Sequence, residues 1–226
     1  LIFEQPKAIE NTLRGRINLY NQEVQPDSVQ KHNSIFKKAK RIIILGCGTS
    51  WHAGLVGEYL LEKITRIPTE VEYASEFRYR DPIIEKDDVI IPISQSGETA
   101  DTMAALKLAK ERGAFIFGIC NVVGSSISRE TDSGMYTHAG PEIGVASTKA
   151  FTTQITVLIL LSLKIAAIKE TINTEENRRL INELELIPER IGTFLKGISQ
   201  VKKIAKIYHQ APNMLYLGRG FNFPVA

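Results

Sequence analysis

The chain has 226 residues, 43% of them hydrophobic, and a formal net charge of +3, so it is long enough to bury a full hydrophobic core. So small a charge, without a basic stripe interleaved with aromatic residues, argues against a nucleic-acid-binding protein. Two widely separated cysteines, Cys47 and Cys120, favour a reducing, cytoplasmic compartment, and the lack of a signal peptide or a bilayer-length apolar stretch argues against a membrane protein.

Residues 1–27 are predicted to form a lead-in, either an arm that packs against the rest of the chain or a linker. Pro6 suits the first turn of a helix within Leu1–Gln22, and apolar residues recur along one face of it: Ile9, Leu13 and Ile17. A second helix is predicted over Ser28–Lys40.

From Arg41 onward, short apolar runs alternate with helical segments. The runs lack polar alternation, as expected of strands buried on both faces of a parallel sheet, and they cover 41–45, 68–73, 89–93, 114–120 and 134–137. Helices are predicted over 51–65, 100–112 and 125–131, whereas the charged and aromatic segment 74–80 is expected to be a solvated loop or a subunit contact. This alternation predicts an α/β fold, a three-layer α/β/α sandwich with a five-stranded parallel sheet.

The last third of the chain is predicted to be helical. Ala150–Lys169 is apolar nearly all round, which requires burial on more than one side and suits a dimer contact. Glu175–Gly197 is expected to break near Pro188, and a further helix is predicted over Gln200–Gln210.

A partial internal repeat suggests how the chain is divided. Phe36–Gly48 and Val201–Gly220 both contain a lysine-rich helical segment, an apolar run and a Gly-x-Gly loop, so a strand is expected over 213–217. We therefore expect residues 28–198 to form one domain and 199–226 to begin a truncated second copy. The chain does not start with methionine, and we expect it to be a fragment of a longer protein.

The ligand site is expected beyond the carboxyl ends of the strands. There, Gly46–Ser50 delivers Thr49 and Ser50 to a helix N-terminus, where capping of the helix is the alternative role for both hydroxyls. Trp51 stands where a dinucleotide-binding fingerprint would need its third glycine, which disfavours a nucleotide ligand.

The central loop, Ser94–Thr99, follows the most apolar strand and opens a helix. It combines unpaired backbone N–H groups of a helix N-terminus with four polar side chains, which favours a phosphate ester; these are Ser94, Gln95, Ser96 and Thr99. A third loop, Gly140–Lys149, has two glycines and a Ser–Thr pair before the long apolar helix. One such loop could merely cap a helix, but three at one sheet edge favour a ligand site.

For the other residues with reactive side chains, we expect structural roles. Cys47 is expected to be a small buried residue rather than a thiolate, and Glu98 to lie in the first turn of a helix, although Glu98 and Glu142 are of a type able to transfer protons. The four histidines lack the spacing of metal ligands, so neither a metal nor a cofactor is expected; they are His32, His52, His138 and His209.

Five motifs together make the chain resemble the isomerase (SIS) half of the glucosamine-6-phosphate synthase family, the glutamine:fructose-6-phosphate amidotransferases. They are Glu4-Gln5-Pro6, Cys47–Ser50, Ala74–Arg80, Ser94–Thr102 and Glu142–Thr152. The set extends over nearly the whole chain and is specific to this family among sugar isomerase domains. The resemblance implies a five-stranded parallel sheet between two helical layers, duplicated in the intact enzyme.

The resemblance also implies roles for individual residues. The phosphate would be held by Thr49, Ser50, Ser94, Gln95, Ser96 and Thr99, and Val145 and Ser147 would face the sugar. The family's glutamine-hydrolysing domain, its proton-transferring glutamate, its Schiff-base lysine and a histidine from the second subunit would all lie outside Leu1–Ala226. The resemblance therefore implies a fragment of a dimeric enzyme that binds sugar phosphate but contains no catalytic residue.

An intact enzyme of this family is a glutamine–fructose-6-phosphate transaminase (isomerizing), which makes glucosamine 6-phosphate from fructose 6-phosphate and ammonia released from glutamine. Two alternatives stay open. A regulatory sugar-phosphate sensor with the same fold would carry a DNA-binding helix-turn-helix, which Leu1–Lys40 does not resemble. A simple aldose–ketose isomerase would lack the amidotransferase part, and the flanking sequence would separate all three.

Overall fold

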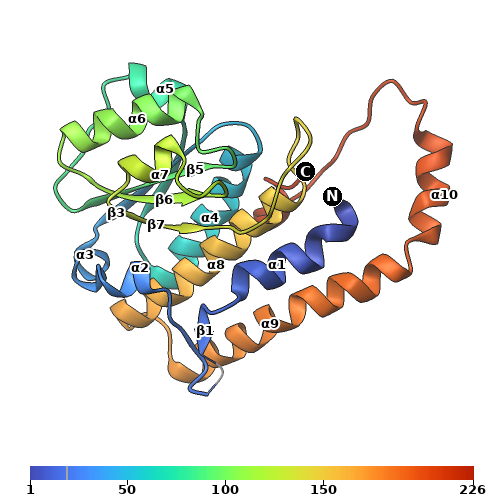
Figure 1. Ribbon diagram of the computed structural model, residues 1–226, viewed down its shortest axis with the longest axis horizontal. Coiled ribbons are helices and arrows are strands. Elements are labelled where there is room, and N and C mark those ends of the chain that lie inside the picture. The colour runs from blue at the N-terminus through green and yellow to red at the C-terminus, as the bar shows by residue number, and fades with distance from the viewer. Residues whose placement is uncertain (19) are drawn as a thin grey trace.

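The computed structural model describes residues 1–18 and 20–226, so Leu19 of the predicted arm lies outside the described residues. Its centre is a five-stranded parallel sheet with the strand order β4-β3-β5-β6-β7 (Figure 1). The strands are β3 (Arg41–Gly46), β4 (Thr69–Tyr73), β5 (Asp88–Ser94), β6 (Phe115–Cys120) and β7 (Ser133–Tyr136). The predicted parallel sheet is confirmed, with every strand within one residue of its expected bounds.

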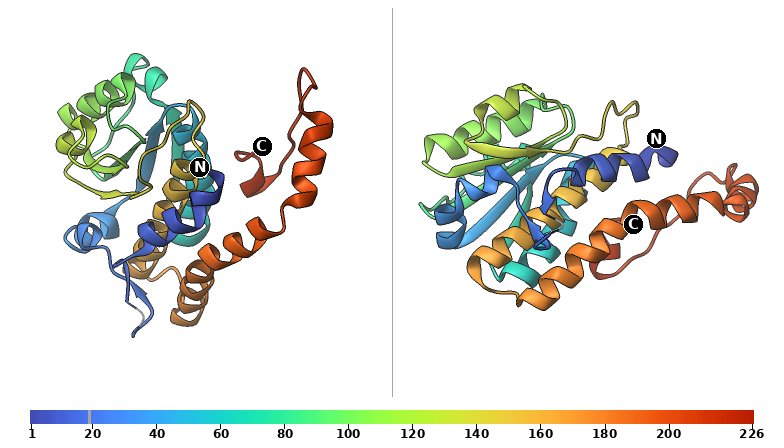
Figure 2. Two further views of the ribbon diagram at one scale, coloured as in Figure 1. Left: turned by 45° about the vertical axis from the view of Figure 1, so that its right-hand side comes forward. Right: turned by 60° about the horizontal axis from the view of Figure 1, so that its bottom comes forward.

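Helices cover both faces of the sheet, which confirms the three-layer arrangement (Figures 1 and 2). One face carries α1 (Gln5–Leu13), α3 (Asn33–Lys38), α4 (Thr49–Thr65) and α8 (Lys149–Lys169), and the other carries α5 (Ala74–Tyr79), α6 (Ala100–Glu111) and α7 (Ser126–Glu130). By length and composition α8 could cross a membrane, but most of its residues are buried within the fold. It is the central helix of one layer.

The strand residues alternate between two hydrophobic cores, as the period of a β-strand requires. Ile42 and Ile44 of β3 enter the core beneath α4 and α8, whereas Ile43 and Leu45 enter the core beneath α5, α6 and α7. Because both faces are covered, the strand sequences are apolar throughout.

The N-terminal arm contains the predicted helix that starts at Pro6, but this helix does not reach Ile17. A short 3-10 turn (Ile2–Glu4) leads into α1, which ends at Leu13, and Gly15 follows in a left-handed conformation with φ +72°. The chain then forms two short antiparallel strands, β1 (Ile17–Asn18) and β2 (Glu23–Val24). Their turn is favoured by Asn18, whose Oδ1 accepts a hydrogen bond from the Tyr20 amide at 3.0 Å.

The arm covers the free edge of β7. The Thr12 hydroxyl donates to the Thr137 carbonyl at 2.5 Å, and Arg16 Nη2 donates to the Tyr136 carbonyl. An edge strand otherwise presents unpaired backbone groups, so these side chains stabilise and protect the edge.

Two segments before β5 also differ from expectation. Ser28–Lys40 is two short helices, α2 (Asp27–Gln30) and α3, rather than one. The solvated loop predicted over Ala74–Arg80 is wrong, because Ala74 and Phe77 are buried one helical turn apart and fold the segment into α5.

The predicted break at Pro188 is wrong: α9 (Thr174–Lys196) continues through this residue. Its buried residues, Ile181 and Leu184, precede the proline, and Ile187 and Ile191 on either side of it still pack against the core. The end of the helix beyond them stands away from the domain (Figure 2). This packing on both sides of Pro188 holds the helix together although the proline lacks a backbone N–H.

The strand predicted over 213–217 does not form. After α10 (Ser199–Tyr208), the chain is irregular except for a 3-10 turn over Gly220–Asn222. Leu215 and Leu217 are 89% and 90% exposed, and no strand lies beside them among the described residues. A strand needs a neighbour for its backbone hydrogen bonds, and the apolar pattern alone cannot supply one.

Candidate functional site

The carboxyl ends of β3 and β5 mark the point where the sheet changes its winding direction. The two strands are neighbours, with Leu45 opposite Pro92, yet Leu61 of α4 and Leu106 of α6 belong to opposite cores. The chain thus leaves these strands toward opposite faces, and such a switch point leaves a crevice where open α/β sheets bind ligands. The loops Gly46–Ser50 and Ser94–Thr99 flank it.

The hydroxyls of the β5–α6 loop shape the loop itself. Ser94 Oγ accepts a hydrogen bond from the Gly97 amide at 2.9 Å and lies 3.1 Å from Thr99 Oγ1, while Ser96 Oγ accepts from the Glu98 amide at 3.2 Å. Thr99 is the N-cap residue of α6, but its side chain makes no capping bond to the helix. The first-turn amides of α6 therefore have no side-chain acceptor from their N-cap.

We predicted that Glu98 lies in the first turn of α6, and this prediction is wrong. Glu98 precedes the N-cap, and its carboxylate accepts a hydrogen bond from the Ser126 amide at 2.8 Å, at the start of α7. Hydrogen bonds from the side chain and backbone of Ser126 lower the pKa of Glu98. The Ile127 amide donates to the Gly97 carbonyl at 2.9 Å, so α7 holds the loop at two points.

The β3–α4 loop brings a backbone turn and two hydroxyls to the other side of the crevice. Gly48, the N-cap of α4, has φ +55° and supplies no side-chain cap. Thr49 is half-buried, whereas Ser50 is buried and its Oγ accepts a hydrogen bond from Gln154 Nε2 of α8 at 3.0 Å. Neither hydroxyl serves as the N-cap, so the capping alternative does not hold at this position.

In the third loop, which precedes α8, the Glu142 carboxylate bonds to the backbone. Glu142 accepts hydrogen bonds from the Thr148 amide at 2.8 Å and from the Ala150 amide at 2.9 Å, which caps the start of α8. Both of its oxygens are thereby engaged. Val145 lies at the tip with its side chain fully exposed, and Ser147 is half-buried nearer the helix.

The loops are therefore not equivalent. Glu98 and Glu142 accept hydrogen bonds at the N-termini of α7 and α8, whereas the N-cap side chains of α4 and α6 make no capping bond. Asp101 lies in the first turn of α6, where it pairs with Arg78 at 3.0 Å, so part of its charge is neutralised. Helix N-termini whose first amides have no capping side chain favour a bound anion. An anionic ligand would accordingly lie between α4 and α6, beside Thr49, Ser50, Ser94, Ser96 and Thr99.

Gln95 faces a separate hollow next to this crevice. The hollow has a volume of about 490 Å³ and is lined by Gln95, Asn121, Val122, His138, Gly140 and Pro141. Asn121 Oδ1 accepts hydrogen bonds from Thr137 Oγ1 at 2.9 Å and the Ala139 amide at 2.8 Å. The structure thus joins the ends of β5, β6 and β7 around one hollow.

Sequence reasoning missed Gln154, Asn121 and His138. Gln154 lies within an apolar helix and 104 residues from Ser50, so no local pattern links them. Asn121 was detectable, because it directly follows a buried strand at the ligand edge of the sheet. His138 was considered only as a metal ligand.

The two cysteines differ in burial. Cys120 is buried at the end of β6, and burial raises the pKa of its thiol to about 11, so it is protonated at neutral pH. Cys47 is only partly buried, not fully buried as expected.

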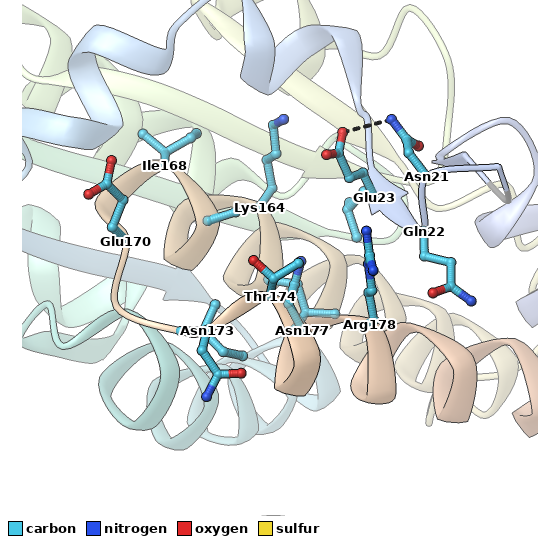
Figure 3. Close-up of a pocket in the computed structure, with 14 residues that line it drawn as sticks. Asn21, Gln22, Glu23, Lys164, Ile168, Glu170, Asn173, Thr174, Asn177 and Arg178 are labelled. Atoms are coloured by element: carbon cyan, nitrogen blue, oxygen red, sulfur yellow. Dashed lines mark hydrogen bonds between the residues drawn. The ribbon is translucent and has the colours of Figure 1, made fainter.

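A second hollow, of about 520 Å³, lies at the other end of α8 (Figure 3). The turn between β1 and β2, the last turns of α8 and the first turn of α9 line it. Lys164 lines it, and burial lowers the pKa of this lysine although the charge of Glu23 opposes the effect. Because Lys169 reaches the Ala39 carbonyl just before β3, this hollow lies at the amino edge of the sheet, away from the candidate site.

The sheet and its switch point define a doubly wound α/β domain, a class of fold with a crevice at the carboxyl ends of its strands. A family model described as "SIS domain" matches residues 35–164, more than half of the chain. The chain belongs to the SIS domain family.

Relatives point to one enzyme within this family. The chain is 56% identical over 225 residues to the glutamine–fructose-6-phosphate aminotransferase (isomerizing) of Chlorobaculum tepidum and 55% identical to that of Bacteroides thetaiotaomicron. These matches include 100% of this chain but 36% and 37% of the relatives, so the chain spans little more than a third of their length.

A solved structure gives the same result. The C-terminal domain of glucosamine-fructose-6-phosphate aminotransferase from Francisella tularensis superposes with a TM-score of 0.93 at 38% identity, over 99% of this chain and 62% of that chain. The chain is thus similar, from end to end, to the isomerase part of this enzyme, and the resemblance drawn from its motifs is confirmed.

Proposed function

We propose that this chain is the sugar-phosphate-binding part of a glutamine–fructose-6-phosphate aminotransferase, which makes glucosamine 6-phosphate. Its ligand would be fructose 6-phosphate or its product. The observation that carries the proposal is the pair of helix N-termini at the switch point, α4 and α6, whose N-cap side chains leave them free for an anion.

The phosphate would lie between these two helices. Thr49 and Ser50 would contact it from the β3–α4 loop, and Ser94, Ser96 and Thr99 from the β5–α6 loop. Charge-assisted hydrogen bonds contribute about 1.5–3 kcal/mol each, so three or four of them, less the cost of ordering the ligand, support millimolar to micromolar affinity. No arginine is required.

The rest of the sugar would lie toward the neighbouring loops. Gln95 would reach it from the β5–α6 loop, and Val145 and Ser147 from the loop before α8. The exposed tip at Val145 is accessible to such a ligand. Glu142, with both oxygens bound to backbone amides, would hold this loop in shape rather than transfer protons.

The wider organisation is also part of the proposal. Residues 1–27 would be the arm, 28–198 the first SIS domain and 199–226 the beginning of a second, with the catalytic glutamate, lysine and histidine elsewhere in a dimeric, cytoplasmic enzyme. The chain by itself would bind sugar phosphate without converting it.

A thermal-shift experiment tests the binding. Fructose 6-phosphate should raise the melting temperature of the chain more than fructose does, and the Ser96→Ala, Thr99→Ala double variant should lose that difference. Ser34→Ala with Thr174→Ala removes two exposed hydroxyls at the opposite edge and serves as the matched control. Equal shifts with fructose and fructose 6-phosphate in the unmodified chain would contradict the proposal.

A further inference from the structure

His138 has a positive φ, which is uncommon for any residue other than glycine, although histidine adopts it more often than most. It lies two residues after β7 with φ +52°, in the left-handed region that costs an L-residue with a bulky side chain about 1–2 kcal/mol. Strain of this kind persists only where surrounding contacts enforce it, and it concentrates at ligand sites.

Asn121 enforces the conformation from one side. Its Oδ1 accepts from Thr137 Oγ1 at 2.9 Å and from the Ala139 amide at 2.8 Å, and its Nδ2 donates to the Gly140 carbonyl at 2.9 Å. These three bonds fix the residues immediately before and after His138, so the backbone cannot relax at this position alone.

The N-terminal arm fixes the same segment from the other side. Thr12 donates to the Thr137 carbonyl at 2.5 Å, and Arg16 donates to the Tyr136 carbonyl. Five side-chain hydrogen bonds from two distant parts of the chain therefore hold the segment Tyr136–Gly140. The flanking Thr137 and Ala139 are buried, whereas the His138 side chain is exposed.

The His138 side chain shares the hollow of about 490 Å³ with Gln95. Asn121 uses its oxygen and one N–H internally, so Gln95 and His138 are the side chains of this hollow whose polar atoms make no hydrogen bond within residues 1–18 and 20–226. Val122 and Pro141 add apolar surface. Neutral donors and acceptors beside small apolar patches suit a polyhydroxylated molecule better than a second anion.

We propose that His138 is a specificity-determining residue of the sugar-phosphate site, hydrogen-bonded through its imidazole to a hydroxyl of the sugar whose phosphate lies at the β5–α6 loop. This inference rests on the proposed function. Gln95 connects the two parts, since it belongs to the phosphate loop and lines the hollow. Burial and the nearby Arg16 lower the pKa of His138, so the imidazole is neutral at physiological pH and able both to donate and to accept.

The test compares two ligands and three proteins by calorimetry. The ligands are fructose 6-phosphate and inorganic phosphate, and the proteins are the unmodified chain, His138→Gly and His209→Ala, which alters an exposed histidine at the end of α10. Loss of one neutral hydrogen bond should weaken fructose 6-phosphate binding about 2- to 10-fold in His138→Gly and leave phosphate binding unchanged. Glycine accepts φ +52° without strain, so this variant should unfold at the same or a higher temperature.

The calorimetry distinguishes failure of the proposed His138 role from failure of the proposed sugar-phosphate binding. Unchanged fructose 6-phosphate affinity in His138→Gly, or an equal loss for both ligands, would overturn the role of His138 while the binding function stands. If the unmodified chain binds neither ligand, both proposals fail. As an independent readout, the carbon-bound imidazole protons of His138 should shift in NMR spectra with fructose 6-phosphate and stay in place with phosphate.

Discussion

Gly97 lies so close to Ser125 that a Cβ atom on Gly97 would collide with the Ser125 side chain. The contact joins the turn of the β5–α6 loop to the residue that precedes α7. Since Gly97 also has φ +68°, both space and backbone conformation require glycine. The loop proposed to hold phosphate is therefore shaped by its neighbour along the sheet as well as by its own hydroxyls.

Gly97→Ala should destabilise the chain by about 3 kcal/mol, because the left-handed backbone costs about 1–2 kcal/mol and the collision adds a similar amount. Gly124→Ala is the matched control: Gly124 has φ +71° but no atom within 4 Å of the added methyl group, so only the backbone cost applies. Urea unfolding measures both. Ser125→Gly should recover part of the loss in Gly97→Ala, and equal costs at the two glycines would contradict the collision.

Asn121→Ala should lower the free energy of unfolding by about 2–3 kcal/mol, since it removes three hydrogen bonds and leaves the buried Thr137 hydroxyl without its acceptor. Asn121→Asp keeps the acceptor of two bonds and loses only the donor to Gly140, so it should cost less. Chemical denaturation of the two variants tests the order. A larger loss in the aspartate variant would show that the amide N–H dominates.

Thr12→Val should destabilise the chain by about 1–3 kcal/mol, because valine keeps the shape of threonine but leaves the Thr137 carbonyl at the sheet edge without this donor. Thr12→Ser retains the hydroxyl and is the control. Hydrogen exchange of the β7 amides offers a local measurement. If exchange there is the same in both variants, the arm does not protect the edge.

The buried thiol of Cys120 predicts a loss of stability at alkaline pH. Its pKa is raised from 9.0 to about 11 in the fold, so folding favours the protonated thiol. That contribution is fully present below pH 9 and disappears as the pH rises to about 11, an effect of about 2–3 kcal/mol. The difference in unfolding free energy between the unmodified chain and Cys120→Ala should therefore shrink over this interval, and a constant difference would refute the prediction.

Local sequence pattern was enough to locate the sheet. The runs at Arg41–Leu45 and Val89–Ile93 are apolar without alternation because both faces of a parallel sheet are covered. The errors arose where contacts between distant residues decide the structure. Phe77 turns a charged segment into a helix by burial, and the run at 213–217 stays irregular for want of a neighbouring strand.

The same distinction applies to the candidate site. The hydroxyls of Ser94, Ser96 and Thr99 were visible in the sequence because strand, loop and helix follow one another directly. The carboxylates of Glu98 and Glu142 were visible too, but their hydrogen bonds to other helix starts were not. Which helix starts are capped by a carboxylate depends on those bonds, so the proposed position of the anion needed three-dimensional information.

Contacts at both ends of α1 connect it to the end of β7 and to the start of α8. Before its start, Glu4 pairs with Lys149, a lysine only 4% exposed, and near its end Thr12 and Arg16 bond to the backbone of Thr137 and Tyr136. The ion pair joins the first turn of the chain directly to the first residue of α8, two residues from Ser147. The start of the chain and the loop proposed to face the sugar therefore share one anchoring point.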